Sequence, residues 1–313
     1  MSFGRDQMKP ALADLARQGV LLGTSSWKYP GWLGQLYTQD RYIWQGRFAE
    51  KRFDRLCLAE YAEVFHTVCV DASYYKFPEA RFLEGLFPQV PREFQFAFKV
   101  TDQITLKRFP NVPRCGPRAG TVNPDFLNAA RFESEFVGPC APYQPQVGLL
   151  IFEFSRFSPA DFAHGREFVA ALDEFLGRLP AGWRYGVEIR NRTFLHPDYF
   201  AALARHGVAH VFSSWQDMPS LGEQLAMPAS RTAPGFLGAR LLLKPGRKYE
   251  AAVKQFSPYN RIQDPYPEGR AAGAGLIQET RSRGGATRAY IYVNNRFEGN
   301  ALETIAAMVE AAR

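Results

Sequence analysis

The sequence predicts a single closed (β/α)₈ barrel of the TIM type, and three observations support this fold class. The chain has 313 residues, of which 46% are hydrophobic and 22% are charged, a composition that suits a globular protein with a large core. Eight short segments rich in β-branched and aromatic residues recur along it, and stretches of helix length separate nearly all of them. This alternation favours parallel strands joined by crossover helices, and eight repeats fit a closed barrel better than an open sheet.

The eight predicted strands follow one another at intervals that leave room for a helix. They are Val20–Trp27, Thr67–Tyr75, Phe94–Val100, Val147–Ser155, Tyr185–Asn191, Ala209–Trp215, Ala239–Lys244 and Ala289–Asn295. Between the first two, apolar residues such as Phe53, Leu56 and Tyr61 recur with the spacing of one helix face. Residues 1–19 are expected to form an N-terminal extension, and residues 20–313 the barrel domain.

Short polar and proline signals predict where some helices begin and end. Ser158-Pro159 and His196-Pro197 each indicate a helix start, because a polar cap satisfies free amides and proline suits the first turn. Gly207 indicates a helix end. Two stretches rich in proline and glycine, Arg108–Pro124 and Phe256–Gly275, are predicted to be long ordered loops.

The overall charge and the cysteines limit the class of protein. Basic residues outnumber acidic ones by 38 to 31, for a net charge of +7, and the isoelectric point is about 9.2. This balance favours anionic partners, whether phosphorylated metabolites, nucleic acids or acidic proteins. The sequence has no C-x-x-C pair, its start lacks the apolar core of a signal peptide, and no apolar run reaches the length of a membrane span. We therefore expect a reduced, cytoplasmic protein without a membrane segment.

Polar side chains end nearly every predicted strand, where barrel enzymes place their reacting groups. The fourth strand also carries Glu153. We predict Asp71, Lys99 and Glu188 as catalytic residues. The predicted substrate-binding residues are Trp27, Tyr75, Arg190, Lys244, Arg247, Asn294 and Asn295. Side chains of mixed charge that converge from different strands would form a cleft able to hold an anionic substrate and move a proton.

Two of these groups also have a structural interpretation. Glu188 and Arg190 lie two apart on one strand face and could form an ion pair without any catalytic role. Lys244 and Arg247 leave the seventh strand in the sector where barrels often bind phosphate, with Gly246 between them. The same four residues, Lys-Pro-Gly-Arg, are also typical of a turn on a basic surface.

The remaining motifs do not identify a cofactor, and no metal site is predicted. His206 and His210 are four apart but lack the glutamate of a zinc-protease helix, and the four cysteines have no metal-binding spacing. Aromatic and basic residues interleave after the first strand, from Trp27 to Trp44. Such a pattern can stack nucleobases, although a packed loop that covers the barrel rim is the commoner explanation and the one we favour.

Several motifs together resemble the YecE-like proteins, the DUF72 family, whose members have a TIM-barrel fold. The opening Gly23-Thr24-Ser25-Ser26-Trp27 is similar to the family's Gly-Thr-Ser-Gly-Trp. Asp71–Pro78 is similar to the family's Asn-Ser-Thr-Phe-Tyr element, and Phe96–Lys99 is similar to its Phe-x-Lys strand. Val187–Arg190 resembles its Glu-x-Arg strand, and Asn294-Asn295 with Gly299 and Ala301 resembles its closing motif. The resemblance covers the chain from about Val20 and implies the barrel fold, but it supplies no reaction.

The chain also departs from the family pattern at four places. Cys69 stands where the family has a glutamate, Leu106 and Asn191 stand where it has histidines, and Pro245 replaces the histidine of its His-Gly-Arg. These departures indicate a divergent branch.

Two functions remain open on this sequence. The first is an enzyme, or a former enzyme, that binds a small anionic substrate at the rim through its phosphate or carboxylate. The alternative is a non-catalytic module that binds nucleic acid or protein through a basic, aromatic-rich rim, and of these partners we do not favour nucleic acid.

Overall fold

Eight parallel strands close into a ring, which confirms the predicted fold class. The computed structural model describes residues 3–313. Around the ring the order is β1-β10-β9-β8-β7-β6-β5-β4. The bounds are β1 (Val20–Thr24), β4 (Thr67–Val70), β5 (Gln95–Lys99), β6 (Val147–Phe154), β7 (Tyr185–Ile189), β8 (Ala209–Ser214), β9 (Phe236–Leu241) and β10 (Arg288–Val293).

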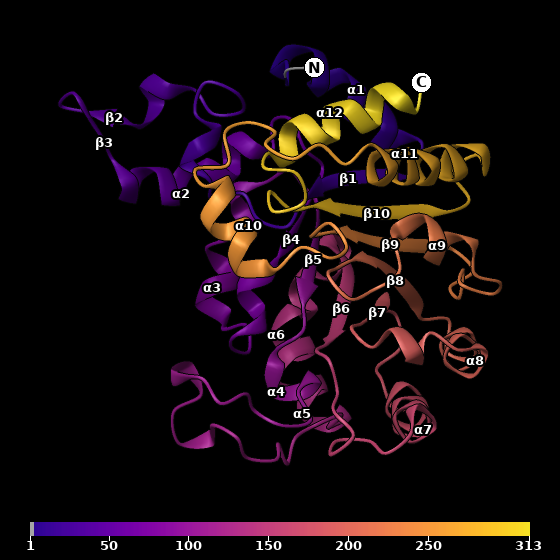
Figure 1. Cartoon of the computed structure of the whole chain (residues 1–313). Helices are drawn as coiled ribbons and strands as arrows, with labels where there is room; N and C mark the ends of the chain where they lie inside the picture. The colour runs from indigo at the N-terminus through magenta and orange to yellow at the C-terminus, as the bar shows by residue number, and fades with distance from the viewer. Residues whose placement is uncertain (1–2) are drawn as a thin grey trace.

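The helices lie outside this ring (Figure 1). They are α1 (Arg5–Arg17), α2 (Glu50–Tyr61), α3 (Ala80–Glu84), α4 (Asp102–Thr105), α5 (Ala129–Phe132), α6 (Gly138–Cys140), α7 (Gly165–Leu176), α8 (Pro197–Arg205), α9 (Leu221–Ala226), α10 (Tyr249–Phe256), α11 (Pro267–Ser282) and α12 (Ala301–Ala311). Within the predicted N-terminal extension, α1 buries Met8, Leu12 and Leu15 in the main core. The first and last helices, α1 and α12, lie near each other at the top of Figure 1.

Two of the local helix signals are confirmed and one is wrong. His196 caps α8, which begins at Pro197, and Gly207 follows its end with a φ of 62°. However, α7 begins at Gly165 and not at Ser158-Pro159. There the Asp161 carboxylate accepts hydrogen bonds from the backbone N–H and the hydroxyl of Ser158, which makes an isolated turn.

Two further boundaries differ from the prediction. The seventh strand of the ring runs over Phe236–Leu241, so Lys244 lies beyond its end. The predicted loop ends at α11, which begins at Pro267. Gly269 and Gly273 lie inside this helix and allow close packing: a Cβ on Gly269 would lie 2.4 Å from the Phe297 ring, and one on Gly273 2.5 Å from Met308.

The ring closes between β1 and β4, which share only one paired position, Thr24 with Val68. A side chain from α2 supplements this short pairing. The Tyr61 hydroxyl accepts a hydrogen bond from the Thr24 backbone N–H at 3.1 Å and donates one to the Thr67 carbonyl at 3.0 Å. Tyr61 therefore links the first and second strands of the chain at the point where backbone hydrogen bonds are few.

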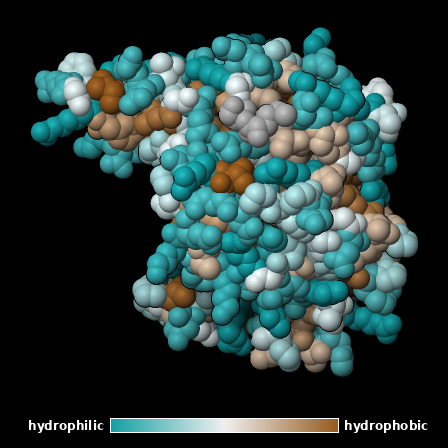
Figure 2. Space-filling model, turned by 45° about the horizontal axis from the view of Figure 1, so that its top comes forward, coloured by the Kyte–Doolittle hydropathy of each residue, from teal (hydrophilic) through white to brown (hydrophobic). Residues whose placement is uncertain are grey.

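The aromatic segment after β1 has two parts. Trp27, Trp32, Tyr37 and Tyr42 are buried and pack around α2. Beyond them, β2 (Ile43–Trp44) and β3 (Arg47–Phe48) form a small hairpin that projects from the upper left of Figure 1. The same arm carries brown apolar atoms in Figure 2. The predicted covering loop thus describes the buried part of the segment and not the hairpin.

We expect Tyr61→Phe to lower the free energy of unfolding by about 1–3 kcal/mol, because two buried backbone groups lose their partner. Urea denaturation measures this difference. Tyr143→Phe is the matched control, since the Tyr143 hydroxyl has no hydrogen bond within residues 3–313 and only its ring packs, on Phe87. Equal stabilities of the two variants would contradict the role given to the Tyr61 hydroxyl.

Candidate functional site

The inside of the barrel changes from apolar to charged toward the carboxyl ends of the strands. Alternate residues of a strand point to the same side, so each inward apolar side chain predicts another inward position two residues later. The interior apolar cluster includes Cys69, Ala97, Ile151 and Val211. Two residues farther along the chain lie Lys99, Glu153 and Ser213 on their strands and Asp71 directly after the end of β4. Glu188 on β7, Arg190 directly after it, and Arg240 on β9 continue this inward pattern.

Arg240 lies at the centre of these groups. Its Nη1 donates to Glu188 at 2.7 Å and to Glu153 at 3.0 Å, and its Nη2 donates to Asp71 at 2.6 Å. Arg240 is not among the predicted site residues, because the predicted seventh strand begins at Ala239 and places Arg240 near its start, whereas β9 begins at Phe236. The inward alternation of Phe236, Gly238 and Arg240 is the signal that could have found it.

Arg190 and Lys99 complete what we call the rim network, namely Asp71, Lys99, Glu153, Glu188, Arg190 and Arg240. Arg190 pairs with Glu188 at 2.6 Å and with Glu153 at 2.9 Å, and Lys99 pairs with Glu153 at 2.9 Å. The Ser213 hydroxyl donates to Glu188 at 2.7 Å. Three carboxylates thus face three cations, and the structure brings together all three predicted catalytic residues with one predicted binding residue, Arg190.

The network keeps its central carboxylate ionised. Burial alone would raise the pKa of Glu153, but the charges of Arg190, Lys99 and Arg240 outweigh it and hold this pKa well below its ordinary value of 4.5. A carboxylate with so low a pKa is a poor proton acceptor near neutral pH. We therefore assign Glu153 an electrostatic role and no proton-transfer role.

Access to solvent differs along the network. The side chain of Glu188 is fully buried and that of Arg240 is 2% exposed, whereas Lys99 is 12% and Asp71 32% exposed. Lys99 and Asp71 therefore form the accessible end. Aromatic rings cover two cations: Trp215 lies 3.8 Å from the Arg190 guanidinium, and Tyr74 lies 3.6 Å from the Lys99 ammonium.

The predicted anion site after the seventh strand is already paired within the chain. Arg247 forms an ion pair with Asp264, and Lys244 lies 3.5 Å from the same carboxylate. Asp264 belongs to the segment between α10 and α11, so its position could not be read from strand order. Neither cation contacts the rim network.

The remaining predicted binding residues lie around the same rim, but they differ in exposure and in hydrogen-bond partners. Tyr75 is 63% exposed, next to Arg114. Trp27 is buried, and its carbonyl accepts a hydrogen bond from Tyr37. Asn294 and Asn295 are buried; the Asn294 side-chain oxygen accepts a hydrogen bond from a backbone N–H in the turn before α12, and that of Asn295 accepts one from the first N–H of α12. These two asparagines hold the turn in place.

A cavity of about 360 Å³ opens beside the network, and we call it the rim cavity. It follows the ends of β5 and β6, and the loop predicted over Arg108–Pro124 forms much of its wall. Its cationic side chains are Lys107, Arg108, Arg114 and Arg156, and its one carboxylate is Asp161. Tyr74, whose ring lies against Lys99, lines the cavity on the side of the network.

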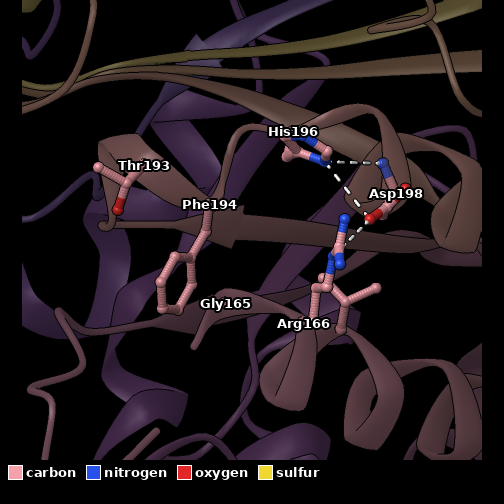
Figure 3. A pocket seen from close by; sticks show the side chains of 7 residues that line it. Gly165, Arg166, Thr193, Phe194, His196 and Asp198 are labelled. Carbon is pink, nitrogen blue, oxygen red and sulfur yellow. Dashed lines mark hydrogen bonds and ion pairs between the residues drawn. The ribbon is translucent and has the colours of Figure 1, made fainter. Parts of the chain in front are cut away.

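A smaller hollow of about 180 Å³ lies farther out, where α7 and α8 begin (Figure 3). Its basic side chains, Arg166 and His196, both face Asp198, at 3.4 Å and 3.5 Å. Phe194 packs over Gly165 in the same hollow, where a Cβ would lie 2.9 Å from the ring. Because Asp198 compensates the charge of Arg166, the hollow offers an anion less positive charge than the rim cavity does.

Two kinds of feature are absent from residues 3–313. No helix there is both long enough and apolar enough to cross a bilayer. The same residues contain no group of three or more histidine, cysteine or acidic side chains arranged so that they could bind a metal ion.

The closed ring and its charged carboxyl-terminal rim define a barrel protein of the (β/α)₈ class. Residues 21–313 match the family described as "Protein of unknown function DUF72", and the chain belongs to this family. This confirms the predicted resemblance. The family description gives no activity, so the function rests on the site.

Individual relatives agree with the family assignment. The UPF0759 protein YecE of Escherichia coli K12 is 25% identical over 182 residues, and the match covers 58% of this chain but only 50% of the relative. A DUF72 family protein of Enterococcus faecalis has a TM-score of 0.63 at 17% identity over 94% of this chain and 95% of its own. One from Thermotoga maritima has a TM-score of 0.53 at 14% identity, over 93% and 97%. These solved structures support the fold alone.

We expect Arg240→Met to lower the free energy of unfolding at pH 7 by about 3–5 kcal/mol, because buried carboxylates lose their shared cation. A depressed carboxyl pKa stabilises the fold above the ordinary pKa of 4.5, and this stabilisation is lost as the pH falls below it. The difference between variant and wild type should therefore be complete at pH 7 and shrink as the pH falls from about 5 to about 3 in urea denaturation. Arg178→Met, which breaks an exposed pair with Glu174, should change little. A pH-independent difference would contradict the electrostatic account.

Proposed function

We propose that this protein binds a small anionic ligand, bearing a phosphate or a carboxylate, at the carboxyl-terminal rim of its barrel. The rim cavity carries the proposal, because four cationic side chains and a single carboxylate surround a volume of about 360 Å³. Concave sites of this size with a few convergent polar groups are the usual form of small-ligand sites.

The balance of charge around the cavity favours an anion. Asp161 lies 3.8 Å from Arg108, and Arg114 is held by Asp102 at 2.7 Å. Lys107 has no ion pair within residues 3–313 and lies over the rings of Phe126 and Phe162. Its charge therefore stays available to a ligand. Arg156 pairs only with Asp217, at 3.6 Å, and both side chains are exposed.

The rim network supports the same ligand class. Arg190 is buried, and its Nε and Nη1 have no hydrogen-bond partner within residues 3–313. Guanidinium donors of this kind pair well with a carboxylate or a phosphate. For chemistry on the ligand, Lys99 is the proposed proton-transfer group and Asp71 its companion at the accessible end. Glu188, buried between Arg190 and Arg240, is proposed to position both arginines.

We expect the double variant Lys107→Gln, Arg156→Gln to bind 3-phosphoglycerate at least about tenfold more weakly than the wild type, since the cavity loses two cations. Asp161→Asn should bind more tightly, because the opposing carboxylate is removed. Isothermal titration calorimetry measures both changes.

Arg166→Gln is the control for this test, because it removes the same charge from the outer hollow of Figure 3. It should leave the affinity unchanged. Absence of saturable binding to the wild type, or equal affinities of wild type and double variant, would contradict the proposal.

One observation favours the alternative function, a nucleic-acid-binding module. Trp44 on the β2–β3 hairpin is 64% exposed, and Arg41 and Arg47 lie close to it in the sequence. Exposed aromatic rings beside cations are the usual platform for unpaired bases.

If this alternative holds, Trp44→Ala should weaken binding of a short oligothymidylate by about 1–3 kcal/mol, the loss of one stacked base. Fluorescence anisotropy measures the affinity, with Val122→Ala as an exposed apolar control on another loop. The wild-type affinity should also fall steeply between about 50 mM and 200 mM salt. Undetectable or salt-independent binding would remove this alternative.

A further inference from the structure

A second and larger cavity lies at the opposite, amino-terminal end of the barrel. Its volume is about 700 Å³, within the range of ligand pockets of roughly 300–1,000 Å³. The strands β1, β4, β5, β6 and β10 all begin around it, and the last turns of α1 cover one side. We call it the base cavity. It is separate from the rim, where barrel enzymes place their chemistry.

The inner part of the base cavity presents an unpaired hydrogen-bond acceptor. Gln95 is 7% exposed, and its Nε2 donates to the Pro145 carbonyl at 2.8 Å. Its Oε1 is buried and has no partner within residues 3–313. A buried acceptor without a partner destabilises the fold, and a ligand that donates to it would remove this penalty.

Two neighbouring groups extend this polar floor. The Tyr290 hydroxyl is also buried without a partner in the described residues; its ring lies near Gln95 beside Gly148, behind the residues that line the cavity. His66 is half-buried, and burial lowers its pKa, so the neutral imidazole can either donate or accept a hydrogen bond. Groups of this kind match hydroxyl or amino substituents.

The walls and the mouth of the cavity have different chemistry. Ala13, Ala16, Leu21 and Pro145 provide apolar walls. At the mouth lie three arginines and one glutamate, namely Arg17, Arg92, Arg288 and Glu93. Arg17 pairs with Asp14, whereas Arg92 and Arg288 form no ion pair within residues 3–313. An anionic group would therefore meet two uncompensated guanidinium groups at the mouth, the chemistry that recognises phosphate.

We propose that the base cavity binds a hydroxylated organic phosphate, with its phosphate on Arg92 and Arg288 and a hydroxyl or amino donor on the Gln95 carbonyl. The carbon skeleton of the ligand lies against the apolar walls. This site is independent of the function proposed for the rim, because it shares no residue with the rim cavity.

Calorimetric titration of the full chain with AMP and with glucose 6-phosphate tests the proposal. At least one of the two should bind saturably at about 0.15 M salt and at least about tenfold more tightly than inorganic phosphate, which lacks the donor-bearing body. The double variant Arg92→Gln, Arg288→Gln should lose at least about tenfold in affinity. Arg283→Gln is the matched control, because this exposed arginine lies outside the cavity and pairs with Glu279. The affinity of this variant for the organic phosphate should equal that of the wild type.

A second variant tests the inner contact. Gln95→Leu should weaken the organic phosphate while leaving the weak binding of inorganic phosphate unchanged, provided that circular dichroism shows a folded chain. If Gln95→Leu does not fold, the Arg92, Arg288 double variant decides alone, since both side chains are on the surface.

Three outcomes would overturn the proposal. They are no saturable binding of either phosphate, binding that the Arg92, Arg288 double variant retains, and binding that the rim variant Lys107→Gln, Arg156→Gln abolishes. The last outcome would assign the ligand to the rim and support the function proposed there, so failures of the two proposals can be told apart.

Discussion

Six charged side chains inside a closed barrel must compensate one another, and this requirement shapes the whole carboxyl-terminal half of the interior. An isolated buried charge costs several kcal/mol, so each carboxylate of the rim network must be matched by a cation within hydrogen-bond distance. Arg240 meets most of this need, because one planar guanidinium reaches Asp71, Glu153 and Glu188 together. Lysine would match these three carboxylates less well, since its donors all lie on one nitrogen and lack the planar fork of a guanidinium.

The network also determines what the rim can offer a ligand. Its three acids and three bases cancel, so the strand ends carry no excess charge and offer a ligand only hydrogen bonds, such as those of the unpaired Arg190 donors. The excess positive charge lies outside the barrel wall, in the loop that follows β5 and in Arg156 after β6. The scaffold thus separates two tasks: the strands hold a neutral, rigid set of charges, and the loops carry the charge that selects a ligand.

The strands could be predicted from sequence because each is a short run of β-branched and aromatic residues bounded by polar ones. The predicted catalytic residues Asp71, Lys99 and Glu188 lie together for the same reason, since parallel strands deliver their carboxyl ends to one rim. The position of Arg240 depends on where its strand begins. A strand that starts at Ala239 puts Arg240 at the amino-terminal end of the barrel, whereas the observed start at Phe236 puts it at the carboxyl-terminal end. Ion-pair partners that come from loops, such as Asp264 beside Arg247, follow no periodic pattern and could not be predicted from the sequence.

The hydroxyl of Tyr61 has a consequence for how the molecule reaches its folded state. It belongs to a helix outside the ring, yet it bridges the seam where the first strand meets the second. The two hydrogen bonds that this hydroxyl adds at the seam form only when that helix is docked. Helix docking and barrel closure are therefore coupled, and a half-barrel that lacks α2 would expose two strand edges to other chains.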